Sequence, residues 1–236
     1  MKALTLSHLG KRPTNQDLLL EQTFKDGSSL FAVNDGMGGY EHGEIAAQLI
    51  VDSMSTYLSS VDIIDSFQIQ KAINKSNLFI RQRNIALLGN MAATIGGIFI
   101  REETVIYFWV GDVKIFHFRN GGLIFESSAH TLVSELVENK SILDPAKLSR
   151  YKHVVTRAIQ GDVKLSQAEL YSGDFDIEND ILIVCSDGVH DLFDGLQFAN
   201  MIERSCNSPT LLFELFKSQL PDLAVDNATV AVIGKN

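Results

Sequence analysis

The chain begins with short apolar segments and then changes to longer stretches in which apolar residues recur with helical spacing. Two of the short segments are joined by "KDGS", a glycine-containing turn that is typical of an antiparallel hairpin. The second helical stretch is the more regular one, and Asp65 is its expected N-cap. The pattern predicts strands over residues 2–8, 17–24 and 28–34, and helices over 42–59 and 65–87.

The second half of the chain returns to strand-like segments and then ends with helices and a strand. Residues 93–127 form four short apolar runs with a turn about every ten residues, which predicts an antiparallel meander. Residues 130–162 are polar and mixed, with helical candidates at 131–138 and 145–150. Further strands are expected over 152–157, 166–170 and 180–184, helices over 194–204 and 208–219, and a last strand in "ATVAVIG" at the C-terminus.

This order of elements bears on the fold class. Strands, helices, strands and helices follow one another in segregated runs, whereas a doubly wound parallel sheet requires strict alternation. Segregated runs favour antiparallel sheets covered by helices. We therefore expect an α+β fold, a four-layer αββα sandwich in which two antiparallel sheets are flanked by helix pairs.

Composition narrows the functional classes. With 236 residues, 45% hydrophobic and 21% charged, the chain is typical of a globular protein, and we expect one domain over residues 1–236. No apolar window is long enough for a membrane span, no signal peptide is evident, and the cytoplasm is the expected compartment. The cysteines, Cys185 and Cys206, suggest no zinc site. The net charge of −9 argues against nucleic acid as a partner.

Five aspartates lie next to the ends of apolar strand segments: Asp17, Asp35, Asp112, Asp187 and Asp226. Taken singly, each is more typical of a turn or a helix cap than of a ligand, because aspartate favours both for local hydrogen-bonding reasons. Two of the aspartates share a pattern that a turn or a cap does not require: an aliphatic run ends in aspartate followed by glycine in both Asp35-Gly36 and Asp187-Gly188.

Chemistry offers a reason for this context. Carboxylates that converge raise one another's pKa and need a compensating cation. Hard divalent ions such as Mg²⁺ and Mn²⁺ take oxygen ligands, and a glycine after the ligand lets its backbone carbonyl come close enough to contribute. The segment "VNDGMGG" therefore predicts a metal-bridging Asp35, with the carbonyl of Gly36 beside it.

Six motifs in order give the chain a resemblance to a known family. It resembles the metal-dependent protein phosphatases of the PPM or type 2C class in their bacterial form. "RPTNQD" is similar to the family's Arg-x-x-Asn-Glu/Gln-Asp element, and "VNDGMGGYEHGEIAA" to its Asp-Gly-Met-Gly-Gly segment. The other four are "FWVGDVKIFHFRNGGL", "VVTRAIQGD", "VCSDGVHDLF" and "DNATVAVI".

The resemblance implies a fold, two ions and a set of ligands. The family's fold is the αββα sandwich, with two Mn²⁺ or Mg²⁺ ions in a cleft between the sheets. By resemblance, Asp35 bridges both ions, Gly36 binds one through its carbonyl, and Asp187 and Asp226 complete the first ion's shell. Asp17 acts through metal-bound waters. Asp112, together with Asp187, supports a third, weaker ion in bacterial members.

The resemblance also implies the reaction, which is hydrolysis of phosphoserine and phosphothreonine by water that bridges the ions. Arg12 holds the substrate phosphate, and Arg12, Asp35 and Asp187 are the expected catalytic residues. Residues 130–162 correspond to the family's flap beside the cleft. Three departures stand out: Gln16 where glutamate is frequent, Val113-Lys114 in place of Ser-Arg, and Ala129 in place of an aspartate before His130.

Alternative interpretations remain open from the sequence. A pseudophosphatase that binds phosphoproteins without hydrolysing them would have lost ligands, whereas this chain retains all five aspartates and Arg12. A phosphatase that acts on one small phosphoprotein would also be an enzyme, but with narrow substrate specificity. The negative net charge disfavours a metal-dependent nuclease. We expect a monomer whose partners are phosphorylated proteins, substrates of a Ser/Thr kinase.

Overall fold

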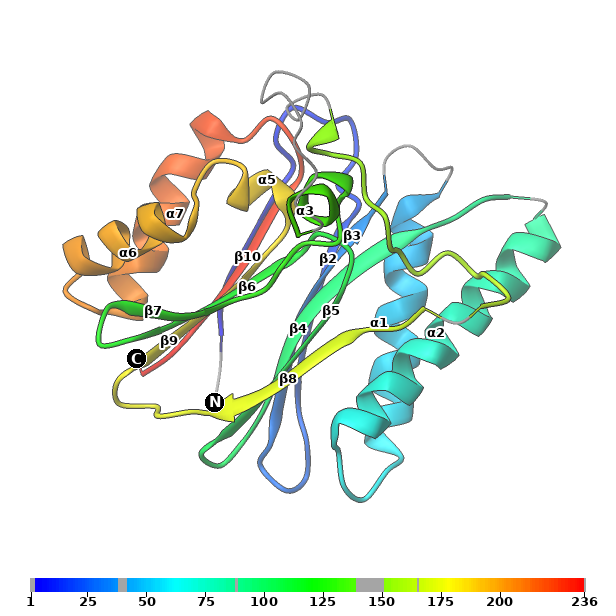
Figure 1. Ribbon diagram of the computed structural model, residues 1–236, viewed down its shortest axis with the longest axis horizontal. Helices are drawn as coiled ribbons and strands as arrows, with labels where there is room; N and C mark the ends of the chain where they lie inside the picture. Colours follow the sequence, from blue (N-terminus) through cyan, green and yellow to red (C-terminus); the bar gives the residue numbers. More distant parts are fainter. Residues whose placement is uncertain (1–2, 38–41, 88, 139–150, 165, 236) are drawn as a thin grey trace.

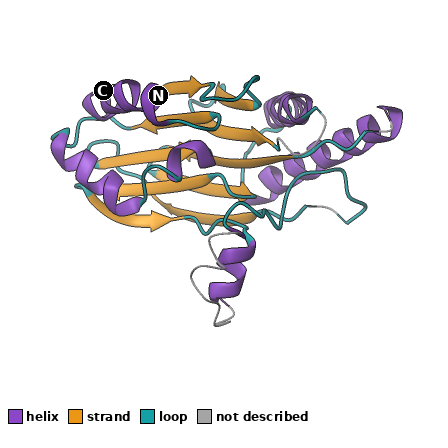
Figure 2. Cartoon of the chain, turned by 90° about the horizontal axis from the view of Figure 1, so that it is seen from above, coloured by secondary structure: helices purple, strands orange, loops and turns teal. Residues whose placement is uncertain are grey.

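The computed structural model describes residues 3–37, 42–87, 89–138, 151–164 and 166–235. Within them the chain forms two antiparallel five-stranded sheets, which lie face to face with helices outside them (Figures 1 and 2). The first sheet has the order β2 (Asp17–Thr23), β3 (Ser29–Gly36), β4 (Ala93–Arg101), β5 (Thr104–Val110) and β8 (Glu169–Asp174). The second has the order β1 (Leu4–His8), β10 (Ala228–Ile233), β9 (Asp180–Cys185), β6 (Lys114–Arg119) and β7 (Gly122–Glu126).

Each sheet is covered on its outer face by a pair of helices. Helices α1 (Gly43–Ser59) and α2 (Ser66–Leu87) pack on the first sheet, and α6 (Gly195–Arg204) and α7 (Pro209–Leu223) pack on the second (Figure 1). Two shorter helices, α3 (Leu132–Glu138) and α5 (Asp187–His190), lie near one end of the sandwich. No helix in the described part of the chain is both long and apolar enough to cross a bilayer.

Three apolar clusters correspond to the three interfaces between the four layers. In β3 the alternation of a strand divides the side chains between two of them. Leu30 and Ala32 join the cluster beneath α1 and α2, while Phe31 and Val33 join the cluster between the sheets. Because both faces of this strand are covered, it is apolar along most of its length. The expected four-layer αββα sandwich is confirmed.

Local sequence explains where the helices begin. The Asp65 carboxylate accepts a hydrogen bond from the Gln68 amide at 2.8 Å, so the expected N-cap of α2 is present. Asp194 and Gln197 form a reciprocal capping box at the start of α6. Helix α7 begins with Pro209 directly after the capping Ser208, a position where proline's missing N–H is no loss.

The expected meander over 93–127 is wrong at its centre. β4 pairs with β5 and β6 pairs with β7, but β5 and β6 belong to different sheets. The chain crosses between the sheets at Gly111, whose φ of +107° is accessible chiefly to glycine. This crossover places Asp112 at the junction of the two sheets.

Other differences fall between residues 145 and 190. The expected strand over 152–157 is absent, and Val155 makes only an isolated bridge to Thr131. The strand expected over 166–170 is shifted to Glu169–Asp174, because the Ala168 amide is bonded to Gln70 of α2 instead of to a strand. Helix α5 was not expected. The helical candidate at 145–150 lies outside the described residues, whereas the candidate at 131–138 is α3.

A glycine in the middle of β4 offers a test of the packing beneath α1 and α2. A β-carbon on Gly97 would lie 2.4 Å from Cζ of Phe108 and 2.7 Å from Cβ of Ala32. We therefore expect Gly97→Ala to lower the free energy of unfolding by about 1–3 kcal/mol, because the ring must move in a close-packed core. Urea denaturation measures this. Gly122→Ala, where the nearest atom would be 3.5 Å away, is the control, and equal effects would contradict the account.

Candidate active site

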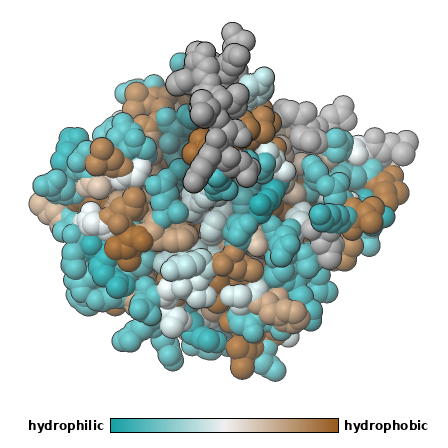
Figure 3. All heavy atoms as spheres, viewed as in Figure 1, coloured by the Kyte–Doolittle hydropathy of each residue, from teal (hydrophilic) through white to brown (hydrophobic). Residues whose placement is uncertain are grey.

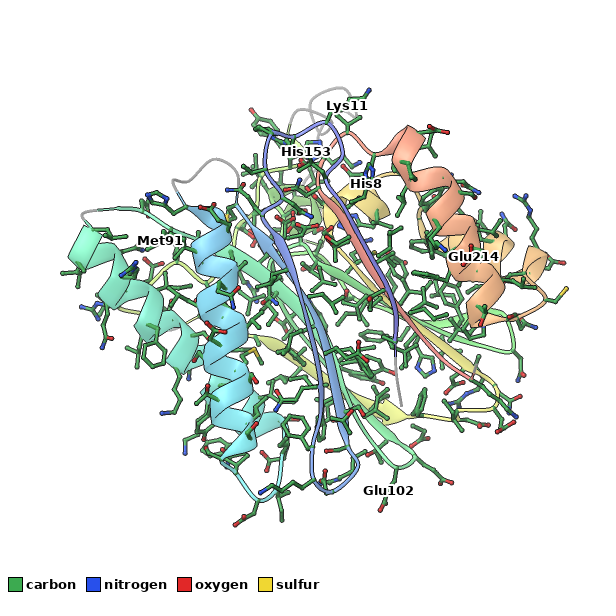
Figure 4. The ribbon with its side chains drawn as sticks, turned by 180° about the vertical axis from the view of Figure 1, so that it is seen from behind. His8, Lys11, Met91, Glu102, His153 and Glu214 are labelled. Carbon is green, nitrogen blue, oxygen red and sulfur yellow. The ribbon has the colours of Figure 1, made fainter. Side chains whose placement is uncertain are left out.

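A cleft of about 940 Å³ opens at the end of the sandwich where β3 and β9 terminate and β10 begins. In Figure 4 this end carries Lys11 and His153, while Glu102, in the turn between β4 and β5, lies at the opposite end. Neighbouring strands are antiparallel, so the ends of some strands and the starts of others lie side by side here, although they are distant in sequence. Residues on the cleft wall include Arg12, Asp35, Gly36, Asp112, Asp187 and Asp226.

The first sheet contributes two carboxylates that face each other. Asp17 at the start of β2 pairs directly with Asp35 at the end of β3, so the two side chains share one face of the hairpin. Like charges in such a position are destabilising, which argues that this pair was not selected for stability. Asp17 is 7% exposed and lies behind the cleft wall, whereas Asp35 is half-buried on it.

The second sheet contributes the remaining carboxylates. Asp187 follows β9 and opens α5, Asp226 precedes β10, and Asp112 lies at the crossover between β5 and β6. Ser186 connects the two sheets behind the cleft. Its hydroxyl donates to Asp17 Oδ2 at 2.7 Å and accepts from the Thr229 amide at 2.9 Å.

The pKa values show how crowded these carboxylates are. Burial, followed by the charges of Asp17 and Asp187, raises the pKa of Asp35 well above its usual value. Burial is also the main cause that raises the pKa of Asp187 to about 8 and that of Asp17 to about 6. The pKa of Asp112 is raised chiefly by burial. The cluster therefore favours either protonation or a cation.

Arg12 is the cation closest to this cluster on the described cleft wall. Its Nε and Nη2 donate to Oδ1 and Oδ2 of Asp226 at 2.7 and 2.5 Å, a bidentate pair. The Arg12 side chain is 52% exposed, so it remains accessible from the cleft. An exposed arginine that can exchange a carboxylate for another planar or tetrahedral oxyanion suits phosphate binding.

Two glycines let backbone segments touch at the cleft. A β-carbon on Gly36 would lie 2.5 Å from the carbonyl of Gly43, at the start of α1, and 2.9 Å from the carbonyl of Gln16. A β-carbon on Gly188 would lie 2.1 Å from the carbonyl oxygen of Asn227. The glycines that follow Asp35 and Asp187 are thus required by close packing of the backbone, as well as by any ligand.

Asn227 fastens the loop that carries Arg12, a role that the sequence analysis missed. Its Oδ1 accepts from the Gln16 amide at 2.9 Å, and its Nδ2 donates to the carbonyls of Leu9 and Thr14 at 2.9 and 3.0 Å. The side chain is 6% exposed, so these bonds are shielded from water. The motif "DNATVAVI" contained the signal, but only the fold shows which loop the asparagine holds.

Two histidines, also missed, support the turn at Asp112. His130 Nδ1 accepts from the Gly111 amide at 3.0 Å, and His190 Nε2 lies 2.9 Å from the Asp112 carbonyl, to which it donates. Burial lowers the pKa of each imidazole to about 4, so both are neutral near pH 7. The turn is therefore well packed even though Ala129 replaces the family's aspartate.

The other departures also have structural partners. Gln16 Nε2 donates to Glu44 of α1 at 3.1 Å, a bond that a glutamate at position 16 could not make without an extra proton. Val113 is buried between the sheets, and Lys114 pairs with Glu126 of β7. These residues serve packing and local charge pairing.

The donor set is of the kind that hard divalent cations prefer, although it is not drawn together into a metal site. Within the described residues, no three Asp, Glu, His or Cys side chains have the arrangement needed to hold an ion. Asp226 is instead turned to Arg12, and Asp17 is bonded through one oxygen to Ser186. The other oxygen, Asp17 Oδ1, is buried without a hydrogen-bond partner in the described part of the chain. Uncompensated carboxylates and an orphaned oxygen fit Mg²⁺ or Mn²⁺.

Comparisons with known proteins agree on one family. The family described as "Protein phosphatase 2C" matches residues 6–211. Protein phosphatase PhpP of Streptococcus pneumoniae is 25% identical to this chain, and the alignment covers 100% of this chain and 98% of PhpP. The serine/threonine phosphatase stp of Listeria welshimeri is 24% identical, with 90% and 86% covered.

Solved structures share the fold. Serine/threonine phosphatase Stp1 from Staphylococcus aureus superposes with a TM-score of 0.87 at 20% identity, covering 100% of this chain and 95% of its own. The catalytic domain of the serine/threonine phosphatase PstP, solved in complex with two manganese ions, has a TM-score of 0.79 at 23% identity, with 98% and 96% covered. At these identities the likeness establishes the arrangement of the chain.

The role of Asn227 can be tested by its removal. Asn227→Ala leaves one amide and two carbonyls of the Arg12 loop without partners, so we expect the free energy of unfolding to fall by about 2–4 kcal/mol. Amide hydrogen exchange should accelerate in residues 9–16. Asn179→Ala, which removes an exposed bond to Asp176, is the control. Unchanged exchange in the loop would refute this role.

The crowded carboxylates predict a pH effect in protein freed of divalent cations by chelation. Folded Asp187 has a pKa of about 8, whereas an unfolded aspartate titrates near about 3.9, so the folded state carries an extra proton at pH 7. Stability is lost as that proton leaves, by about 1 kcal/mol between pH 7 and 9. His130 and His190 do not titrate in this window. Urea denaturation should show a shallower pH dependence in Asp187→Asn, and equal slopes would contradict the account.

Proposed function

Since the chain belongs to the protein phosphatase 2C family and is a protein-serine/threonine phosphatase, we propose that it hydrolyses phosphoserine and phosphothreonine in proteins with the aid of divalent cations held in the carboxylate cleft. The observation that carries this proposal is the convergence of aspartates from both sheets. Asp35 feels the charges of Asp17, Asp112, Asp187 and Asp226 together, an arrangement that costs stability unless a cation enters it.

The resemblance to the family suggests how the oxygens of the cleft would be shared among the ions. Asp35 lies on the cleft wall and would bridge two Mn²⁺ or Mg²⁺ ions, with the Gly36 carbonyl beside it. Asp187 and Asp226 would complete the shell of the first ion, and Asp17, set behind the wall, would act through water. Asp112 and Asp187 would support a third, weaker ion. Every one of these donors is an oxygen, which suits hard cations.

The bound ions would supply Lewis acidity, which lowers the pKa of the attacking water and neutralises charge on the transferred phosphoryl group. The chain's own residues hold the substrate. Arg12 would leave Asp226 and take two phosphate oxygens in the same bidentate manner, which frees the Asp226 carboxylate for an ion. Asn227 keeps the Arg12 loop in place during this exchange.

A cysteine nucleophile is not part of the proposal. Cys185 is fully buried in β9, and burial raises the pKa of its thiol far above the neutral range, so it is neither accessible nor ionised. Cys206 is exposed, follows the C-terminal end of α6 and is not on the cleft wall within the described residues. Hydrolysis by water is thus the reaction that these side chains support.

The alternative is a pseudophosphatase that binds phosphoproteins without hydrolysing them. The complete set of five aspartates with Arg12 favours the active enzyme, because a binding module would not need to maintain so many repelling carboxylates. We further propose that the chain acts as a cytoplasmic monomer on substrates of a Ser/Thr kinase.

Activity measurements decide between these functions. With Mn²⁺, the wild type should hydrolyse p-nitrophenyl phosphate and a phosphothreonine peptide, and Asp187→Asn should lower the rate on the order of 10²-fold or more because a ligand is lost. Asp222→Asn, an exposed aspartate of α7, should leave the rate unchanged. Circular dichroism and thermal melting confirm that each variant is folded.

Two outcomes would overturn the proposal. Equal rates with Mn²⁺ and with chelator would reject the role of the ions. No turnover by folded wild type would reject the enzyme, and binding of the unhydrolysed phosphothreonine peptide would then support the pseudophosphatase.

A further inference from the structure

Helix α2 is strongly basic in an acidic protein. Its residues 66–87 include Lys71, Lys75, Arg81 and Arg83 but no aspartate or glutamate, although the chain as a whole has a net charge of −9. Figures 1 and 4 show that α2 lies at the outer edge of the molecule, beside α1. Attraction of a negatively charged partner would therefore be concentrated at this helix.

The solvent face of α2 is also apolar. Phe67 is 63% exposed, Leu78 45% and Phe79 48%, and these side chains alternate along the helix with Lys71 and Lys75 at spacings of three and four residues. Figure 3 shows hydrophobic residues next to hydrophilic ones at the edge of the molecule where α2 runs. Exposed aromatic side chains gathered on one helix face are typical of surfaces that bind another chain.

A pocket of about 400 Å³ lies where this face of α2 meets α1. Its walls include Leu49, Ser53, Thr56 and Tyr57 of α1 and Lys75 and Phe79 of α2. Leu49 and Phe79 are apolar, and the Lys75 ammonium lies 5.0 Å from the centre of the Tyr57 ring. The pocket thus combines apolar walls with a cation at its rim, which suits a ligand with an apolar body and a negative neighbour.

A polar group in the same wall lacks a partner. Ser53 is 7% exposed, and its hydroxyl has no hydrogen bond in the described part of the chain. A buried hydroxyl without a partner costs free energy, which a ligand carbonyl or amide could recover. This observation is independent of the charge of α2 and points to the same place.

We propose that the α1–α2 pocket docks an acidic segment of a partner protein, which inserts one large apolar or aromatic side chain between Leu49 and Phe79. Carboxylates on either side of that residue would meet Lys71 and Lys75, and a backbone group would reach Ser53. Asp52 also lines the pocket, and its negative charge disfavours a densely charged polyphosphate or a lipid surface compared with a short peptide.

The pocket lies within reach of the cleft for a single peptide segment. Helix α1 begins at Gly43, which touches Gly36 of the active site, and Ser53 lies about 15 Å farther along the helix at 1.5 Å per residue. A segment that joins a docked side chain to a phosphorylated residue in the cleft needs at least about five extended residues. Recruitment of substrates rests on the proposed function, whereas docking itself does not.

Peptide binding tests the docking. The probe is a fluorescein-labelled peptide of about ten residues with one phenylalanine among glutamates, compared with the same peptide carrying alanine, or glutamine for glutamate. Fluorescence anisotropy should show that Lys75→Glu weakens binding at least about tenfold, because attraction becomes repulsion at the pocket rim. Phe79→Ser should weaken it similarly, and both altered peptides should bind poorly.

A matched lysine in the other helix layer provides the control. Lys217 of α7 is exposed and lies 5.9 Å from the Phe213 ring, so it matches Lys75 in exposure and in its aromatic neighbour, although it also pairs with Glu214 at 3.0 Å. Lys217→Glu should leave peptide binding within about twofold of the wild type. Failure of the peptide to bind, or equal losses in Lys75→Glu and Lys217→Glu, would overturn the proposal. So would binding of phosphatidylglycerol vesicles without binding of the peptide.

A second arm measures catalysis in the same variants. A phosphothreonine peptide extended by the acidic segment should have a lower KM than the unextended peptide with the same kcat, because docking raises its effective concentration. Lys75→Glu should remove that advantage without changing hydrolysis of p-nitrophenyl phosphate. If the chain hydrolyses nothing, the anisotropy result still decides the docking proposal, so the two failures are distinguishable.

Discussion

The carboxylates at the junction of the two sheets repel one another. The rest of the structure must hold them together despite this repulsion. Two unit charges 4 Å apart near a protein surface interact by about 4 kcal/mol, and a folded domain is stable by only about 5–15 kcal/mol. Several ionised aspartates therefore could not remain together in the ion-free protein. The raised pKa values of Asp17, Asp35 and Asp187 are the expected response. The three apolar interfaces of the sandwich hold the strands in register despite this repulsion.

Two buried polar side chains at the cleft, Ser186 and Asn227, connect the site to the rigid sheets. Ser186 joins β9 to Asp17 of the opposite sheet and to β10, while Asn227 ties the loop of Arg12 to the start of β10. Both side chains are buried with their hydrogen bonds made, so displacing either leaves groups unpaired in a dry environment. The position of Arg12 is therefore determined by the sheets, although the guanidinium itself is exposed. Such an arrangement keeps the loop fixed while its side chain can exchange partners.

The four layers and the position of the aspartates beside strand ends could be predicted from the sequence, because both depend on local patterns. Apolar runs of strand length began or ended at aspartates, and antiparallel pairing places the end of one strand beside the start of its neighbour. It did not predict that β5 and β6 belong to different sheets, since a turn at Gly111 looks the same whether the chain folds back or crosses over. Val155 lay in a strand-like segment that has no partner strand beyond Thr131. The roles of Asn227 and Ser186 depend on contacts with residues far away in the sequence, which no local pattern specifies.

Helix α1 connects the cleft with the outer face of the protein. Its first residue, Gly43, packs against Gly36, and Gln16 donates to Glu44 in its first turn. A glutamate at position 16 would face Glu44 with a like charge, so the glutamine found here keeps the start of the helix attached to the β2 side of the cleft. A rigid attachment fixes the distance between the α1–α2 pocket and Asp35. Because effective concentration depends on that distance, a pocket on a rigid helix can select substrates by the spacing between a docking residue and a phosphorylated one.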